Sequence, residues 1–220
     1  MAQGLEAPVT TLLLAVTGLV TYLAFKRHEL MQALLFRPRA ILVGHQYHRM
    51  LTSAFIHGDW VHFVFNAFTL YSFGSHLEQL YGVTELLVIY FASVIGGSLL
   101  SLWIHRRDAD YAALGASGGV CGVLYASIFL IPGGGIYIMP IPVAIPSWLF
   151  AILFLLFSSY GMSSKNTKIG HDAHFGGAIV GVLAAAVQYP QIIQHDPLLF
   201  GGVMALSTGV FLWALRRSGG

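Results

Sequence analysis

The stretch LGASGGVCGVL, residues 114–124, raises the question that decides the fold: whether its serine serves helix packing or chemistry. Ser117 stands between glycines, and the residues after it continue as an apolar helix. Gly118 and Gly122 are four apart and share one helix face, where small residues let two helix backbones approach closely in a membrane. The stretch therefore suits both a helix contact and an exposed nucleophile, and the rest of the chain has to distinguish them.

The composition is that of a membrane protein. The 220 residues are 56% hydrophobic and 9% charged, with a mean hydropathy of +0.74. A soluble domain carries about 25% charged residues. The net charge of +2 does not indicate a nucleic-acid-binding surface. The one cysteine, Cys121, excludes an internal disulfide framework.

Apolar runs of near-spanning length recur along the chain and predict helices, since spanning segments must satisfy their backbone groups internally. We expect helices near residues 8–25, 60–80, 84–104, 115–132, 146–162, 173–190 and 197–215. The first run is expected to be a retained helix rather than a signal peptide, because residues 1–10 lack Lys and Arg and no A-x-A pattern follows.

The predicted fold class is an all-α polytopic membrane protein. Residues 1–220 form a single membrane domain, with a six-helix core over about residues 8–190 and a seventh transmembrane helix at 197–215. The connection 26–59 mixes apolar and basic residues and is expected to lie at the membrane interface. The connection 131–146 is rich in Pro and Gly and is expected to be non-helical.

The basic residues favour a seventh helix and an orientation. With seven spans, all 11 Lys and Arg fall on one side, in the first, third and fifth loops and the C-terminal tail. They are Lys26, Arg27, Arg37, Arg39, Arg49, Arg106, Arg107, Lys165, Lys168, Arg216 and Arg217. The positive-inside rule predicts that this side is cytoplasmic.

Polar residues within the apolar helices gather in three places, and such residues are functional candidates because burying them in lipid is costly. They are His57, His62 and Asn66 at the start of the second helix, Ser117 at the start of the fourth, and His171, Asp172 and His174 at the start of the sixth. These helix starts follow loops on the same side, so the three clusters are expected at similar depth.

Glycines make contact between the clusters plausible. Gly177 and Gly181 lie three and seven residues after His174 on one helix face, and Gly118 and Gly122, four residues apart, share a face of the helix that carries Ser117. Close packing of the fourth and sixth helices would place a serine hydroxyl and an imidazole within the roughly 2.6–3.2 Å of a catalytic hydrogen bond.

Other interpretations of these residues stay open. The glycines and serine could serve packing alone, and the histidines and Asn66 could cap and anchor the helix. A zinc site is disfavoured because HExxH is absent and no carboxylate stands at ligand spacing from the histidines. A transporter could use Glu78 and Asp172 as proton-relay carboxylates. Asp172 points away from His174 around the helix, which makes it a poor third member of a triad.

The ordered motifs resemble the rhomboid intramembrane serine proteases over about residues 45–185. They are H-x4-H-x3-N (His57, His62, Asn66), GxSG (Gly115 to Gly118) and A-H-x2-G-x3-G (Ala173, His174, Gly177, Gly181). The stretch YHRMLTSAFIHGDWVHFVFN, residues 47–66, also looks like that family's first loop running into its second helix.

The resemblance implies an endopeptidase that uses a Ser–His dyad, without metal or cofactor. Ser117 would be the nucleophile and His174 the general base. His62, Asn66 and the Ser117 backbone N–H would stabilise the oxyanion, and Gly115 would allow close approach of the chain there. The substrates would be membrane proteins cut in or beside a transmembrane segment in the lipid bilayer.

Some features depart from the family pattern or stay open. Cys121 stands where an aromatic residue often packs on the histidine, and His48 stands where a Trp is common before Arg49, which with Glu78 matches structural positions. The alternative function is a catalytically silent rhomboid-like protein that binds or retains membrane proteins. The expected location is the bacterial inner membrane, where many relatives face their site outward although the charges here predict the cytoplasm. Substrate identity and oligomeric state are not indicated.

Overall fold

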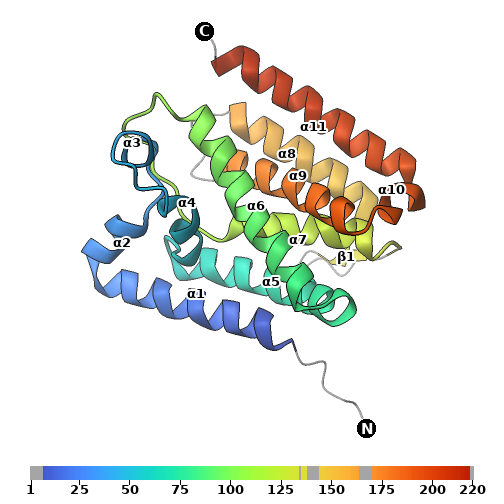
Figure 1. Cartoon of the computed structure of the whole chain (residues 1–220), viewed down its shortest axis with the longest axis horizontal. Helices are drawn as coiled ribbons and strands as arrows, with labels where there is room; N and C mark the ends of the chain where they lie inside the picture. The colour runs from blue at the N-terminus through green and yellow to red at the C-terminus, as the bar shows by residue number, and fades with distance from the viewer. Residues whose placement is uncertain (1–6, 134, 138–143, 164–169, 219–220) are drawn as a thin grey trace.

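A computed structural model describes residues 7–133, 135–137, 144–163 and 170–218 of the chain (Figure 1). Helices form at all the predicted places: α1 (Pro8–Lys26), α5 (Trp60–Tyr81), α6 (Val83–Ile104), α7 (Ser117–Leu130), α8 (Ser147–Ser163), α9 (His171–Gln188) and α11 (Pro197–Ser218). The described architecture is therefore all-α, as predicted, apart from one short hairpin.

Helix α7 is shorter than the 115–132 predicted for it. It begins only at Ser117, because Gly115 has a φ of +116° that a right-handed helix excludes. Its 14 residues reach about 21 Å, less than the roughly 30 Å of a bilayer core. The helix start that carries Ser117 must therefore sit below the membrane surface if α7 ends near the other face.

Two helices of the described chain, α1 and α6, are long and apolar enough to cross a membrane by themselves. The apolar parts of α7, α8 and α11 are shorter, at Ser117–Leu130, Ser147–Phe157 and Pro197–Trp213. Helices α5 and α9 have the length, but they carry the polar residues of the candidate site. The number of spans therefore stays a prediction.

The first connection contains short helices: α2 (His28–Leu34), α3 (Pro38–Leu42), α4 (Arg49–Thr52) and the 3₁₀ turn η1 (Ser53–Phe55). Arg49 ties them together, since its Nη1 donates to the carbonyl oxygens of Gln32 and Leu35, each at 2.8 Å. A guanidinium can serve two carbonyls at once because its donors form a planar fork. Arg49 thus has the structural position that the family resemblance implied.

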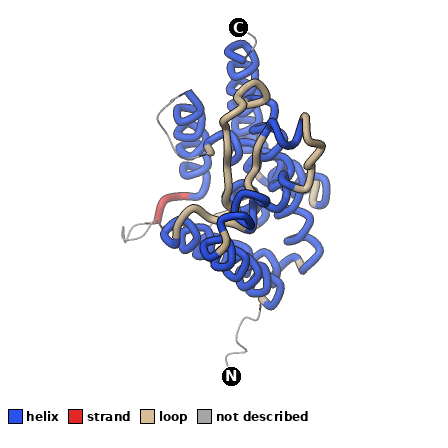
Figure 2. Tube along the Cα trace, turned by 90° about the vertical axis from the view of Figure 1, so that its left-hand side faces the viewer, coloured by secondary structure: helices blue, strands red, loops and turns tan. Residues whose placement is uncertain are grey.

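The connection between α7 and α8 is non-helical where it is described, as predicted. Strands β1 (Gly135–Tyr137) and β2 (Ala144–Pro146) pair antiparallel, with Ile136 opposite Ile145, and the hairpin stands at one side of the helices (Figure 2). Residues 134 and 138–143 of this connection lie outside the described part, as do Lys165 and Lys168 of the fifth loop. A short helix α10 (Gln191–His195) links α9 to α11.

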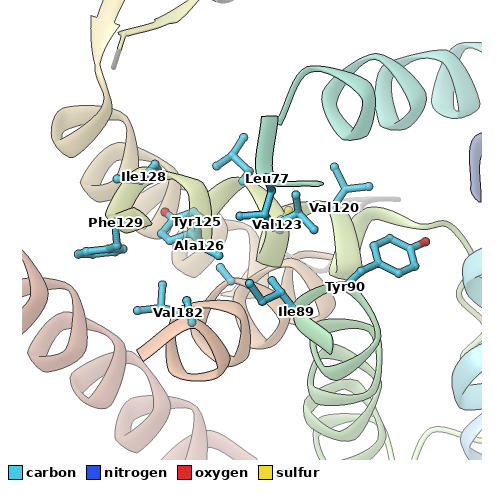
Figure 3. Packing of buried hydrophobic residues seen from close by; sticks show 14 of the residues in the cluster. Leu77, Ile89, Tyr90, Val120, Val123, Tyr125, Ala126, Ile128, Phe129 and Val182 are labelled. Carbon is cyan, nitrogen blue, oxygen red and sulfur yellow. The ribbon is translucent and has the colours of Figure 1, made fainter. Parts of the chain in front are cut away.

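Helix α7 forms the centre of the core. Every residue from Gly118 to Leu130 is buried, which is the pattern of a helix surrounded on all sides. Figure 3 shows its Val123 and Tyr125 among side chains of the neighbouring helices: Leu77 from α5, Ile89 and Tyr90 from α6 and Val182 from α9. The serine at the start of this helix is therefore held by the best-packed part of the molecule.

The two ends of the helix bundle are tied by different contacts. At one end, Glu78 of α5 accepts hydrogen bonds from the Val9 and Thr10 backbone N–H groups and from the Thr10 hydroxyl at 2.7–2.9 Å. A carboxylate suits the unsatisfied donors and positive dipole of a helix N-terminus. The opposite end carries the first and third loops, and the starts of α5, α7 and α9 lie there.

Candidate active site

The predicted site residues meet at one cavity of about 940 Å³. Its lining includes His62, Asn66, Gly115, Ser117 and His174, from the first turns of α5, the segment before α7, and the starts of α7 and α9. Ser117 and His174 are half-buried, and Asn66 is 8% exposed. Residues far apart in the chain thus share one partly enclosed space, as their predicted depth required.

Glycines bring α7 and α9 into backbone contact. A Cβ added at Gly177 would collide with the Gly118 carbonyl, and one added at Gly181 would collide with the carbonyl of Gly122. A Cβ at Gly118 would stand 3.3 Å from the Ala173 carbonyl oxygen, directly before His174. These four glycines thus lie where α7 and α9 contact each other, next to the helix starts that carry Ser117 and His174.

Gly115 is required by both conformation and space. Its φ is +116°, in the region that L side chains avoid. A Cβ there would lie 2.7 Å from Cε1 and 2.9 Å from Nε2 of His62. Its own N–H donates to the Ser53 carbonyl at 2.9 Å, which fixes the segment beside the first loop. The chain therefore approaches the His62 ring as closely as a residue without a side chain allows.

The start of α5 is capped by Asp59, whose role the sequence analysis missed. Its Oδ1 accepts from the His62 backbone N–H at 2.7 Å. An Asp directly before an apolar helical run is a signal for such a cap and could have been recognised. Asn66 donates from Nδ2 to the His62 carbonyl at 3.0 Å, one turn along the same face. Asp59 thus fixes the helix start on which His62 and Asn66 stand.

His57 lies behind the site, not in its wall, and links three segments. Its Nε2 accepts from the Ala116 N–H at 3.4 Å, so Nδ1 carries the proton and donates to the Thr21 hydroxyl at 3.1 Å. The Thr21 hydroxyl in turn reaches the Phe55 carbonyl at 3.3 Å. Burial lowers the pKa of His57 to about 4, and nearby His62 adds to this. The neutral ring therefore holds the residue directly before Ser117.

Asp172 belongs to a separate polar cluster. Its Oδ2 lies 3.3 Å from Nε2 of His105, at the end of α6, and the Tyr111 ring stacks on the His105 ring at 3.5 Å between centroids. Burial raises the pKa of Tyr111 well above its ordinary value, and Asp172 raises it further. The sequence prediction placed Asp172 away from His174; in the structure it joins the third loop to the start of α9.

An aromatic contact on His174 also escaped the sequence analysis. The ring of Phe154 in α8 stacks on that of His174, with centroids 6.2 Å apart and planes inclined by 27°. In an apolar helix, the sequence alone does not distinguish an aromatic side chain that packs on a site residue from one that faces lipid. No pattern therefore pointed to Phe154. Cys121 is buried and lines the same cavity.

Fold and site together define a helical membrane protein with a serine, two histidines and an asparagine around one cavity. The Rhomboid domain family model matches residues 44–191, which include every one of these side chains. The chain therefore belongs to the rhomboid family and is an integral membrane protein.

Individual relatives come from mitochondria and bacteria. Rhomboid protein 1, mitochondrial, of Saccharomyces cerevisiae is 32% identical over 61% of this chain and 40% of its own length. RHOMBOID-like protein 12, mitochondrial, of Arabidopsis thaliana is 32% identical over 63% of this chain and 46% of its own. Rhomboid protease GluP of Bacillus subtilis is 28% identical over 82% of this chain and 34% of its own. The chain thus matches less than half the length of each of these relatives.

Proposed function

We propose that this chain is an intramembrane serine endopeptidase that hydrolyses peptide bonds in or next to transmembrane segments of membrane proteins. The observation that carries the proposal is the meeting of Ser117 and His174 at one cavity with His62 and Asn66. Membership of a family that includes a named protease, GluP, supports the same conclusion.

In the proposed reaction Ser117 and His174 form a dyad. The Ser117 Oγ attacks the scissile carbonyl carbon while its proton passes to the neutral imidazole of His174. The tetrahedral intermediate collapses when the imidazole returns that proton to the leaving amine, which leaves an acyl-enzyme. Water then attacks the ester in the same way and releases Ser117. Asp172 takes no part, because it pairs with His105.

His62, Asn66 and the Ser117 backbone N–H are the proposed donors to the oxyanion. The cap at Asp59 and the close approach of Gly115 fix the first turn of α5 beside the start of α7. Donors fixed in advance stabilise developing charge without having to reorganise during the reaction. Gly115 has the further role of leaving the space that the His62 ring occupies.

The proposal includes a membrane arrangement. Residues 1–220 form one membrane domain of six core spans with α11 as a seventh, in the bacterial inner membrane. The contacts between Glu78 and the start of α1, and between His105 and Asp172, support a bundle with two distinct ends. The substrates are membrane proteins reached from the bilayer, and no cofactor or metal takes part.

Purified protein in liposomes, presented with a model transmembrane substrate, tests the proposal. Wild type should cleave it, and Ser117→Ala and His174→Ala should each abolish cleavage. Ser127→Ala is a matched control, since Ser127 lies on the same helix with its hydroxyl bonded back to the Val123 carbonyl. Cleavage by Ser117→Ala at the wild-type rate would refute the assignment. Binding of the substrate without cleavage by wild type would favour the catalytically silent alternative.

A further inference from the structure

Helix α8 presents an aromatic face to the histidines of α9. Phe150, Phe154 and Phe157 follow one another at four and three residues and so share one face of α8. Phe150 stacks on Phe154 with centroids 5.9 Å apart, Phe154 stacks on His174 at 6.2 Å, and Phe157 meets His171 edge-on at 5.2 Å. The proposed base is therefore in ring contact with a side chain of a different helix.

The neighbours of His174 make this contact significant. On the α7 side stand Gly118 and Gly122, which have no side chain to support a ring. The adjacent carboxylate, Asp172, is held by His105 at the end of α6. A general base must be held within hydrogen-bond reach of the hydroxyl it deprotonates. Phe154 offers the flat apolar surface that can hold the imidazole in this way.

Helix α7 explains why the supporting ring comes from α8. Cys121 is one turn beyond Ser117 and lines the cavity with Phe150, Phe154 and His174. One further turn along, the Tyr125 ring lies 5.6 Å from that of Phe154, so this face of α7 is directed at Phe154. Cys121 is small and lines the same cavity as Phe154 and His174, so α7 offers no ring at this position and Phe154 supplies one from α8.

The ring of His171, on the same helix as His174, also meets the His174 ring edge-on, with centroids 6.1 Å apart. We propose that Phe154 is the positioning residue that another helix supplies to His174, so that the place of α8 determines whether the dyad is competent. This inference rests on the proposed function. It predicts that the stacked ring contributes to the chemical step and not to substrate binding. Losing one such contact corresponds to a loss of roughly tenfold in kcat.

The test compares Phe154→Leu and Phe154→Tyr with Phe157→Leu as the matched control. Phe157 lies on the same helix face but contacts His171 and is 57% exposed. Phe154→Leu should lower kcat and the rate at which a small fluorophosphonate labels Ser117, with KM for the transmembrane substrate unchanged. Phe154→Tyr and Phe157→Leu should keep the wild-type rates. The small probe matters because it does not have to enter past α8 as a substrate would.

A double variant that moves the aromatic ring from α8 to α7 provides a second test. Phe154→Ala combined with Cys121→Phe should recover a large part of the labelling rate that Phe154→Ala loses, because the aromatic surface then comes from α7. Labelling of Phe154→Leu at or above the wild-type rate, or no recovery in the double variant when it folds as wild type, would overturn the proposal.

An NMR measurement separates this inference from the proposed function. The ring current of Phe154 shifts the NMR signals of the carbon-bound protons of the His174 imidazole. Phe154→Leu should therefore change these chemical shifts, and Phe157→Leu should not. If wild type neither cleaves nor labels, the proposed function fails, while the NMR shift still decides whether Phe154 holds His174. Unshifted imidazole signals in Phe154→Leu would contradict the contact itself.

Discussion

At the scale of single residues, backbone geometry and long-range hydrogen bonds set the site. Ser117, His174, His62 and Asn66 could be predicted as candidates because polar side chains in apolar helices are rare and expensive. The partners of His57 and His174 could not, because Thr21 and Phe154 are distant in sequence and occur in apolar helices without a pattern. Gly115 shows how a single missing side chain shapes the proposed oxyanion site.

Replacing Gly115 by Ala should impair catalysis severely. The positive φ strains any L side chain, and the new Cβ would stand 2.7 Å from the His62 ring. Displacing one oxyanion donor predicts a loss of roughly 100-fold in kcat. Steady-state kinetics beside Gly58→Ala provides the comparison, since a Cβ at Gly58 has its nearest neighbour at 3.7 Å. Equal activity of the two variants would contradict the assigned geometry.

The neutral state of His57 predicts a pH dependence. Its pKa falls from an ordinary 6.5 to about 4 on folding, so the unfolded chain binds a proton first as the pH drops. The stability that neutral His57 contributes is full above pH 6.5 and is lost as the pH falls toward 4, by about 3 kcal/mol. Thermal unfolding of wild type at decreasing pH should show this loss of stability, and His57→Gln should lack the part of the loss that comes from His57. Identical stability profiles of the two proteins against pH would contradict the role assigned to neutral His57.

At the scale of helices and strands, every long helix could be predicted from the sequence, but the short helices of the first connection could not. Apolar runs determine the helices, and Pro190 explains why α9 ends at Gln188, since proline lacks the N–H that a further helical turn requires. The short helices of the first connection depend on contacts such as Arg49 with the Gln32 and Leu35 carbonyls. Local patterns do not encode such contacts.

The packing of α7 on α9 predicts that Gly177→Ala will push the two helices apart. Its Cβ meets the Gly118 backbone, which cannot move aside as a flexible side chain would. Overpacking of this kind costs about 1–3 kcal/mol of stability and should also separate Ser117 from His174. Thermal unfolding and cleavage assays measure both effects. Gly202→Ala on α11 is the control, because nothing lies within 4 Å of the added Cβ. A fully active, equally stable Gly177→Ala would contradict the packing argument.

At the scale of the whole molecule, the loops that carry most of the basic residues converge on the end where the candidate site lies. Phe36 and Ala113 exchange backbone hydrogen bonds at 3.0 and 3.1 Å, which joins the first loop to the third. His105 and Asp172 join the third loop to the start of α9. In Figure 1 helix α11 runs from α10 back toward the end where α3 lies. Whether α11 is a seventh span stays a prediction.

The charge distribution predicts how the protein is oriented in the membrane. The positive-inside rule predicts that the site end and the C-terminal tail face the cytoplasm. Alkaline phosphatase fused after Gly220 should therefore be inactive in bacterial cells. The same reporter fused after His195, which removes α11, should be active on the other side. High activity of the Gly220 fusion would show either the opposite orientation or that α11 does not span.

The central claim is that Ser117 is a nucleophile activated by His174, and fluorophosphonate labelling with peptide mass spectrometry tests it most directly. Wild type and Ser127→Ala should carry the adduct on Ser117, His174→Ala should carry little, and Ser117→Ala should carry none. An unlabelled Ser117 in folded wild-type protein, or equal labelling of His174→Ala, would contradict the account.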